Sequence, residues 1–417
     1  MKCLQICGLV DAYSAGAFIV SELASRGLKV IHIQSSKNIP KYYEKSFIRD
    51  NFIDNLVFDD NLEDILTKLR YYNPLFIFAG CEPGVSFADI LRHRLNLYPN
   101  DIGMSPARRN KYEMIKALQD AGLHTANQYR SKNVSEILNW IHSSQKWPIV
   151  IKPLDSAGTD NVVVCSSEEE VKTAFQQIMG KINLVGLKNE EVLAQSFLNG
   201  EEYIVNFVSW EGQHLMSDIW HMPKKIIKGA GRIYDRSELM EMDGKIQDEI
   251  KRYIAKVLDA LKIKYGPSHC EIMFTRDGPA LIEIGARVDG GNVYINKKKI
   301  KIFDRHQIEL TVDAFFSPKD FLNRINKPNK IVRYAMEVCL RSDKNGTLKN
   351  YKNLDKIERL SSFWEMHLKL APGDKLKRTV DMSTAPGVIW LAHDDKSQLF
   401  SDYDAIRNLE NDLYVLL

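Results

Sequence analysis

The stretch GPSHCEIMFTRDGPALIEIGARVDGG, residues 266–291, decides the fold. Apolar residues alternate on both sides of TRDG as in two strands, and the Asp-Gly pair between them is a strong hairpin signal. A three-residue loop over residues 276–278, with Gly278 in the left-handed conformation, pairs Glu271 with Glu283. Directly opposed side chains share a sheet face, with Cβ atoms roughly 4.5–5.5 Å apart, and like charges there repel. We therefore expect a positive charge between the two carboxylates.

Strands and helices alternate over the first hundred residues, which predicts a doubly wound parallel sheet and an α/β fold class. The full GxGxxG spacing is absent, so the signal for dinucleotide binding is weak. A helix over residues 109–122 is followed by a linker, then by strand-like stretches up to residue 221 and a long helix from residue 245. Short strands and turns from about residue 328 predict a small β-rich C-terminal domain. The expected domains are an N-terminal α/β domain, a central nucleotide-binding and catalytic region, and this final domain: residues 1–107, 108–318 and 319–417.

The composition is that of a globular protein of 417 residues, with 44% hydrophobic and 27% charged residues. The net charge of +3, from 57 basic and 54 acidic residues, argues against a dedicated nucleic-acid or membrane-surface binder. No apolar run approaches the roughly 20 residues of a membrane span. The six cysteines form no CxxC pair and are interpreted as reduced thiols of a cytoplasmic protein. They are Cys3, Cys7, Cys81, Cys165, Cys270 and Cys339.

Three further pieces of sequence carry candidate chemistry. In VIKPLDSAGTDNVVV, Lys152 precedes a small-residue turn whose backbone N–H groups can approach phosphate oxygens. LAQSFLNGEEYIV is either a surface hairpin or a hinge that reads adenine and ribose. In the opening stretch, two carboxylates suit Mg²⁺ bound together with substrate phosphates. If that strand continues past Glu283, Gly285 and Arg287 share its face, and an arginine there suits a phosphoryl group or a carboxylate.

The order of these pieces resembles the ATP-grasp family over about residues 1–320. The match is most similar to the L-amino-acid ligases, which join two amino acids into a dipeptide. The stretches that carry the resemblance are GCEPGVSFADIL, RRNKYEMIKALQDAGL, KPLDSAGTDNV, GPSHCE and IEIGARVDGG, with GDKLKRTVDMSTAPGVIWLAHDD near the C-terminus. The resemblance implies an ATP-grasp fold and a carboxylate–amine ligase that uses ATP and Mg²⁺, with Mn²⁺ as a substitute.

The resemblance also implies a role for each matching residue. ATP phosphates are held by Lys111 and Lys152 and covered by a loop containing Ser156, Ala157, Gly158 and Thr159, which we expect to be unanchored without nucleotide. Adenine is read by Gln195, Ser196 and Leu198, and ribose by Glu202. The metal ligands are Glu271 and Glu283, and the catalytic residues are Arg287, which steadies the acyl phosphate, and Lys152. The substrate contacts are Glu82, Asp218, His221, Arg287, Gly290 and Gly291.

Several positions leave alternatives open. Gly285 stands where many ATP-grasp enzymes have an Asn, which leaves the ligands of a second Mg²⁺ undetermined. Glu82 is either a substrate contact or a turn-capping carboxylate, and His269 can orient the neighbouring Glu271. Zinc is rejected because His214 and His221 lack a third ligand at useful spacing. The basic run at residues 297–301 is interpreted as a solvated loop rather than a guard over an acidic substrate.

The sequence thus predicts an ATP-dependent ligase that forms a dipeptide through an acyl phosphate, with small-molecule partners and a homodimer left open. One rival keeps the fold and changes the acceptor to a different amine or a hydroxy acid. The other is a non-catalytic nucleotide-binding module, which does not require Lys152, Glu271, Glu283 and Arg287 together. No pattern in the sequence indicates which amino acids are joined, in which pathway, or in which oligomeric state.

Overall fold

The computed structural model describes the chain except residues 1–4, 42, 228–230, 292–300, 326 and 381–383. Four residues of the basic run, 297–300, and Cys3 lie outside the described part. The other five cysteines are buried and carry free thiols. Within the described residues, no helix is both long and apolar enough to cross a membrane.

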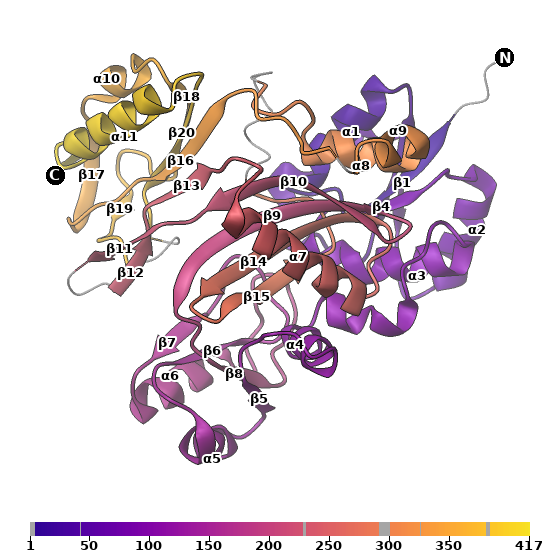
Figure 1. Cartoon of the computed structure of the whole chain (residues 1–417), viewed down its shortest axis with the longest axis horizontal. Helices are drawn as coiled ribbons and strands as arrows, with labels where there is room; N and C mark the ends of the chain where they lie inside the picture. Colours follow the sequence, from indigo (N-terminus) through magenta and orange to yellow (C-terminus); the bar gives the residue numbers. More distant parts are fainter. Residues whose placement is uncertain (1–4, 42, 228–230, 292–300, 326, 381–383) are drawn as a thin grey trace.

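The N-terminal part is the expected parallel sheet with helices on both faces (Figure 1). Its strand order is β3-β2-β1-β4, and the helices α1 and α8 cover one face while α2 and α3 cover the other. The carboxyl ends of β1 and β4 lie side by side, so the turns that follow them meet at one sheet edge. The elements are β1 (Ile6–Val10), α1 (Gly16–Ser25), β2 (Lys29–Gln34), β3 (Asp54–Val57), α2 (Leu62–Tyr72), β4 (Ile77–Ala79), α3 (Val85–Leu95) and α8 (Gln307–Phe316).

A smaller antiparallel sheet of order β5-β8-β6-β7 follows, packed on the helices α5 and α6. The predicted linker after residue 122 is wrong: it contains β5 and α5, because Asn133 caps a helix whose apolar face includes Ile137 and Ile141. The elements are α4 (Lys111–Asp120), β5 (Gln128–Ser131), α5 (Val134–Ser144), β6 (Ile149–Pro153), β7 (Val163–Cys165), α6 (Glu168–Ile178) and β8 (Val192–Ser196).

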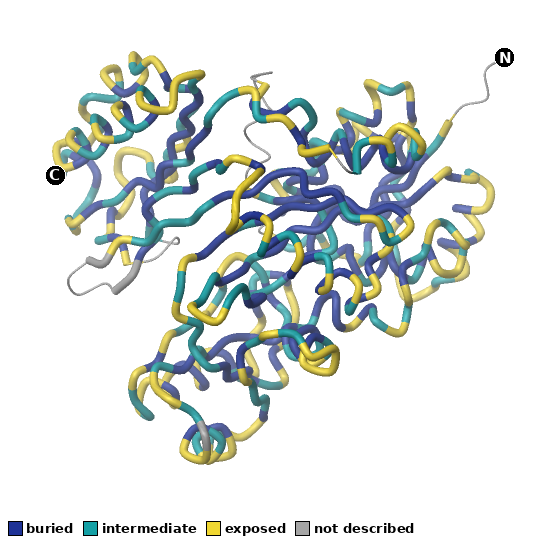
Figure 2. The backbone as a smooth tube through the Cα atoms, viewed as in Figure 1, coloured by how far each residue is buried: buried dark blue, intermediate teal, exposed yellow. Residues whose placement is uncertain are grey.

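The largest sheet has eight strands in the order β15-β14-β9-β10-β13-β16-β20-β18. One of its faces buries an apolar cluster against α4 and α7, and its central strands are dark blue in Figure 2. The opposite face carries the charged residues described below. The elements in this stretch of sequence are β9 (Gly200–Trp210), β10 (Gln213–His221), β11 (Lys224–Ile227), β12 (Gly231–Tyr234), β13 (Arg236–Leu239), α7 (Lys245–Ala260), β14 (Gly266–Thr275) and β15 (Gly278–Gly285). Of these, β11 and β12 form a separate two-stranded sheet.

The predicted hairpin pairs Glu271 with Glu283, but by a different route from the one expected. Thr275 pairs with Gly278, so the turn has two central residues rather than three. A bulge between Glu271 and Ile272 then shifts the register by one residue and restores the opposition of the two carboxylates. Gly278 has a positive φ of 102°, which favours glycine.

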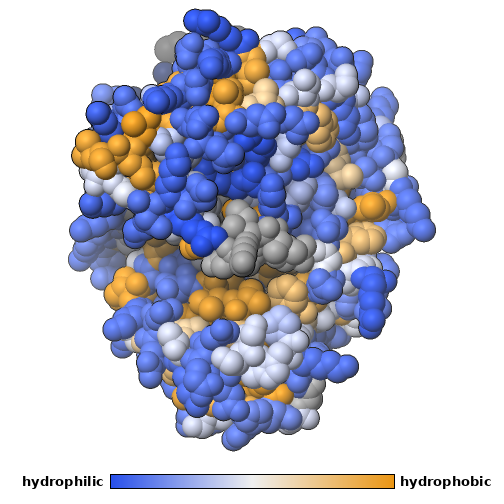
Figure 3. Space-filling view, turned by 90° about the vertical axis from the view of Figure 1, so that its left-hand side faces the viewer, coloured by the Kyte–Doolittle hydropathy of each residue, from blue (hydrophilic) through white to orange (hydrophobic). Residues whose placement is uncertain are grey.

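The C-terminal part continues the large sheet, because β16 pairs with β13. Its predicted β-rich texture missed α11, a 15-residue helix that packs on β16 and β20. Hydrophilic residues predominate on the face shown in Figure 3. The remaining elements are α9 (Pro318–Leu322), β16 (Tyr334–Cys339), β17 (Gly346–Tyr351), α10 (Leu354–Glu358), β18 (Phe363–Leu368), β19 (Lys375–Leu376), β20 (Gly387–His393), α11 (Lys396–Glu410) and β21 (Tyr414–Leu416).

Candidate functional site

The opposed carboxylates of Glu271 and Glu283 form the centre of the site. Lys111, the first residue of α4, places its Nζ 2.9 Å from Glu283 Oε2, and His269 Nε2 lies 3.6 Å from Glu271 Oε1. Burial and the charge of Glu283 raise the pKa of Glu271. Burial also disfavours the charge of Glu283, but Lys111 outweighs burial and lowers the pKa of that carboxyl. We expected a positive charge between the two carboxylates; Lys111 supplies one at Glu283.

The donor set of this pair fits Mg²⁺. Two carboxylates side by side offer the hard oxygen ligands that Mg²⁺ binds in combination with substrate phosphates. Within the described residues, no group of three His, Cys, Asp or Glu side chains converges as a cage made by the protein alone. An ion held by Glu271 and Glu283 would take its remaining ligands from water and from the oxygens of a bound phosphate.

Lys152 lies next to this pair on β6. Its side chain is buried, and burial together with the charge of Lys111 lowers its pKa to about 8. Glu283 and Glu271 act in the opposite direction on this pKa, so Lys152 interacts with Lys111 and with both carboxylates. A polyphosphate brought to this point would meet two lysines.

The loop between β6 and β7, residues 154–162, is anchored, contrary to expectation. Ser156 donates its hydroxyl to Asp160 at 2.7 Å, and Asp160 accepts the backbone N–H of Leu184 at 2.9 Å. Lys111 Nζ donates to the carbonyl of Ser156 at 2.7 Å. The tip, Gly158 and Thr159, is exposed and has positive φ values of 67° and 62°. The base of the loop is thus fixed while its tip remains accessible, with Ala157 between them half-buried.

The residues assigned to adenine and ribose lie on and after β8. Gln195 is buried and donates to Gln128 at 3.2 Å, whereas Ser196 and Leu198 are half-buried. Glu202, on β9, is held by the first residue of β11 and the last residue of β12, which pair with each other. It accepts the Tyr234 hydroxyl at 2.8 Å and lies 2.5 Å from Lys224 Nζ.

At the other end of the site, Glu82 joins two arginines. Arg109 Nη1 donates to its Oε1 at 2.5 Å, and Arg287 Nε donates to its Oε2 at 2.8 Å. Burial opposes ionisation, but Arg287 and Arg109 outweigh it and lower the pKa of Glu82 to about 2. In the contacts that the structure describes, the partners of the Glu82 carboxylate are thus two arginines. Arg109 was missed by sequence reasoning, and its only signal was its place two residues before Lys111.

Gly285 is explained by the same contacts. The strand β15 ends at this residue and does not continue to Arg287 as expected, yet the chain bends so that the guanidinium returns beside it. A Cβ at position 285 would lie 2.7 Å from Glu82 Oε2 and 3.1 Å from the central carbon of the guanidinium. The Asn common elsewhere cannot fit here without displacing the ion pair.

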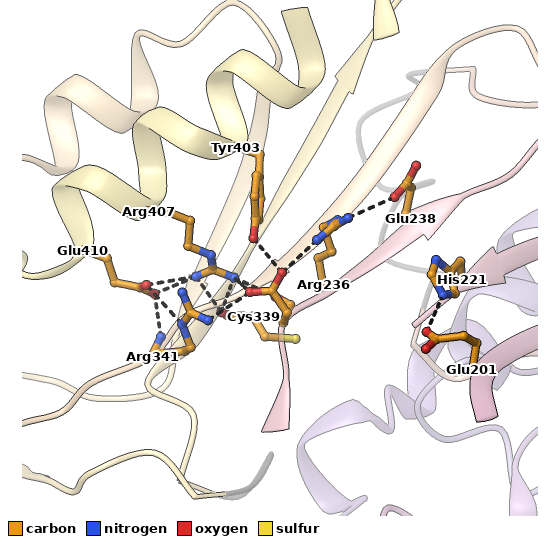
Figure 4. Close-up of polar contacts among 10 residues, drawn as sticks. Glu201, His221, Arg236, Glu238, Cys339, Arg341, Tyr403, Arg407 and Glu410 are labelled. Carbon is orange, nitrogen blue, oxygen red and sulfur yellow. Dashed lines mark hydrogen bonds and ion pairs between the residues drawn. The ribbon is translucent and has the colours of Figure 1, made fainter. Parts of the chain in front are cut away.

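Asp218 and His221 do not lie together. The register places Asp218 opposite Asn206, on the sheet face of His269 and Glu271, where Asn206 donates to it at 2.6 Å. Burial and the charge of Asp289 raise the pKa of Asp218 to about 6. His221 is three residues further along the strand and thus on the opposite face, where it contacts Glu201 at 3.0 Å (Figure 4). The prediction of a substrate contact at His221 is not supported by this placement.

Residues 286–291, which follow β15, contain the two glycines assigned to the substrate. Gly291 donates its N–H to Asp289 at 2.8 Å, and Gly290 lies beside Ser14 from the turn after β1. Asp289 also faces His269 at 3.6 Å. Burial disfavours the charged imidazole, but Asp289 outweighs it and raises the pKa of His269, which lies against Glu271 as the sequence suggested. The site therefore combines cations for a polyphosphate, carboxylates for a metal and an arginine for a further anion.

Comparisons with known proteins agree with this chemistry. Residues 145–295 match a family described as "ATP-grasp domain". Dapdiamide A synthase of Enterobacter agglomerans is 32% identical over 422 residues, covering 99% of this chain and 97% of that protein. The L-arginine-specific L-amino acid ligase of Bacillus subtilis is 25% identical over 230 residues, 55% of this chain and 53% of that protein. The crystal structure of an L-amino acid ligase from Bacillus licheniformis superposes with a TM-score of 0.74 at 18% identity over 100% of both chains, a likeness of fold.

Proposed function

Because this chain belongs to the ATP-grasp ligases, enzymes that use ATP to form C–N bonds, we propose that it joins two L-amino acids into a dipeptide. ATP phosphorylates the carboxylate of the first amino acid, and the amine of the second attacks the acyl phosphate. The products are the amide, ADP and phosphate. The similarity to L-amino acid ligases supports an amino-acid substrate.

The observation that carries this proposal is the placement of Arg287 beside the paired carboxylates and the two lysines. A protein that only binds nucleotide needs the lysines and the metal ligands. It does not need, in addition, a buried arginine held by Glu82. Such an arginine suits a second anion, the carboxylate that becomes an acyl phosphate.

Each residue then has a task that its surroundings support. Lys111 and Lys152 neutralise negative charge on the transferring phosphoryl group, and the loop at Ser156–Thr159 excludes water from it. Mg²⁺ held by Glu271 and Glu283 adds charge neutralisation when it is bound. Arg287 orients the carboxylate and stabilises the charge of the tetrahedral intermediate. Positioning and electrostatics carry the reaction, so no covalent protein nucleophile is required.

A phosphate-release screen tests the proposal. The enzyme, ATP and Mg²⁺ are incubated with every pair of the twenty amino acids, and products are identified by mass spectrometry. We expect phosphate release that depends on both amino acids, with one amide formed per phosphate. The similarity to a dapdiamide synthase is the reason to include amide-bearing acids and other amines as a second panel. Release with no amide product in either panel would refute the ligase.

The variant Arg287→Lys separates a ligase from a nucleotide-binding module. A guanidinium makes two parallel charged hydrogen bonds that lysine cannot reproduce, and one such stabiliser is typically worth about 10²–10³ in rate. We expect Arg287→Lys to bind ATP nearly normally and to form amide roughly tenfold more slowly or worse. Full amide formation by this variant, or loss of ATP binding, would contradict the role of Arg287.

A further inference from the structure

Arg109 connects the two ends of the site. It is 7% exposed and lies directly before Asn110, which caps α4. Its Nη1 binds Glu82, and its Nη2 binds Asp155 at the start of the loop between β6 and β7, residues 154–162. This loop is called the phosphate loop below. Glu82 in turn binds Arg287, so a continuous series of ion pairs runs from the phosphate loop to Arg287. The part of the site around Arg287, where the proposed function puts the substrate carboxylate, is called the acyl end below.

The contacts of Arg287 show which nitrogens of its guanidinium these ion pairs engage. Glu82 engages its Nε at 2.8 Å, and the carbonyl of Val288 accepts from its Nη1 at 3.1 Å. Among the contacts that the structure describes, Nη2 is the guanidinium nitrogen of Arg287 that remains for a ligand. Because Glu82 gives its second oxygen to Arg109, it holds Arg287 through one oxygen only.

A neighbouring residue shows that burial alone does not create this arrangement. Arg108 is 0% exposed and is paired with Asp89 at 2.8 Å. Its other donors reach the carbonyls of Leu261 and Asp101, so it ties the N-terminal helices to the end of α7. Arg108 and Arg109 are consecutive buried arginines, of which one connects structural segments and the other connects groups of the site.

We propose that Arg109 is a positioning residue that couples the phosphate loop to Arg287, an inference that rests on the function proposed above. With Arg109 present, Glu82 is shared, and the guanidinium of Arg287 keeps Nη2 for the substrate. Without Arg109, Glu82 has two oxygens for Arg287 and draws the guanidinium into a bidentate pair. Asp155 also loses its ion pair with residue 109, so a movement of the phosphate loop is no longer transmitted to Arg287.

Kinetics of Arg109→Met and Arg109→Lys test the coupling. We expect amide formation to fall roughly tenfold, a loss of about 1.4 kcal/mol in transition-state stabilisation, while the KM for ATP changes less than about threefold. Lysine offers one point charge and cannot bridge two carboxylates with a fork, so it restores little. Arg108→Lys is the matched control: it lowers the melting temperature without lowering the rate of amide formation. Equal kcat losses in Arg108→Lys and Arg109→Lys would overturn the proposal.

A double variant isolates the role of Glu82. If Arg109 acts by sharing that carboxylate, its loss matters less where position 82 is neutral. We expect Arg109→Met to reduce the rate less in a Glu82→Gln background than in the wild type. Equal fold-losses in both backgrounds would mean that Arg109 does not act through Glu82.

Hydrogen exchange measures the coupling between the phosphate loop and the segment of Arg287 without requiring catalysis. A non-hydrolysable ATP analogue with Mg²⁺ should alter exchange at residues 156–159 and at residues 285–291 in the wild type. In Arg109→Lys we expect the change at 156–159 alone. A change at both segments in the variant would refute the coupling. A wild type that makes no amide but shows both exchange changes would refute the ligase and leave Arg109 as the link.

Discussion

Gly285, Glu82 and Arg287 illustrate how one position depends on two others far away in the chain. Arg287 follows Gly285 by two residues, whereas Glu82 precedes Arg287 by 205. The missing side chain at Gly285 makes room for the ion pair between the other two. A residue with a Cβ at position 285 would therefore press against that ion pair.

The two carboxylates should respond differently to neutralisation. Glu271→Gln removes a charge that the neighbouring Glu283 repels, so we expect metal-free stability equal to or above that of the wild type. Glu283→Gln leaves Lys111 buried without its carboxylate, and we expect a loss of roughly 1–2 kcal/mol. Urea unfolding in EDTA measures both free energies, and phosphate release should be lost in both variants. Equal destabilisation by the two substitutions would contradict the assignment of Lys111 to Glu283.

The β14–β15 hairpin shows how an element reaches the expected pairing by compensation. The two-residue turn alone would place Glu271 one residue out of register with Glu283. The bulge beside Glu271 adds the missing residue, and bulges are common where a strand has to re-aim a functional side chain. The alternating pattern predicts the two strands, but the position of the bulge is decided by packing on both faces.

The loop between β6 and β7 is the element in which nucleotide should produce the largest local change. Asp160 fixes its base through Ser156 and Leu184, so Asp160→Ala should speed hydrogen exchange at residues 156–159 without nucleotide. ATP with Mg²⁺ should then protect these residues in both proteins, with the larger change in the variant. Glu190→Ala, at an exposed position of the same subdomain, serves as the control. Identical exchange in Asp160→Ala and the wild type would show that Asp160 does not hold the loop.

The eight-stranded sheet joins the C-terminal strands β16, β20 and β18 to the strands that carry Glu271 and Glu283. The C-terminal strands join the sheet where β16 pairs with β13, a boundary called the seam below. Asp235 is buried at the seam, and Tyr403 donates its hydroxyl to it at 2.6 Å. Three arginines also contact this carboxylate (Figure 4): Arg236, Arg341 and Arg407. Asp235 directly follows Tyr234, which binds Glu202. The same segment therefore joins the C-terminal helix α11 to the carboxylate assigned to ribose.

Removal of the charge at this seam should destabilise the protein in a pH-dependent way. Burial opposes ionisation of Asp235, but Arg407, Tyr403 and Arg341 outweigh it and lower its pKa below 3.8. The stabilisation is therefore present above about pH 4 and is lost as the pH falls through the pKa of the folded state. We expect Asp235→Asn to lose roughly 3 kcal/mol or more at pH 7, because buried arginines lose their partner, and less near pH 3.

Urea unfolding at both pH values measures this difference. Asp355→Asn, in an exposed pair with Arg359, is the control and should change the free energy of unfolding by less than about 0.5 kcal/mol. A loss for Asp235→Asn that is the same at both pH values would show that its charge does not stabilise the seam.

Local patterns in the sequence were sufficient for the parallel N-terminal sheet and the hairpin, whereas the opposition of Glu271 and Glu283 also depends on a bulge that the pattern does not specify. Alternation, turn residues and helix caps act over a few neighbouring residues, so they can be recognised without the fold. The order of the lysines and carboxylates was also sufficient to identify the ATP-grasp resemblance. Two helices were not predicted: α5, in the stretch expected to be a linker, and α11, in the part expected to be β-rich. Their caps, Asn133 and Asp395, were local signals that the sequence reasoning overlooked.

Only the tertiary structure decided which charges meet. Lys111 with Glu283, Arg109 with Glu82 and Asp155, and the seam at Asp235 all join segments that are distant in the sequence. The pairing of a buried charge depends on how far water is excluded and on which opposite charge packing brings within reach. Strand register likewise turned Asp218 toward the site and His221 away from it. These outcomes come from burial and long-range packing, which no local run of residues specifies.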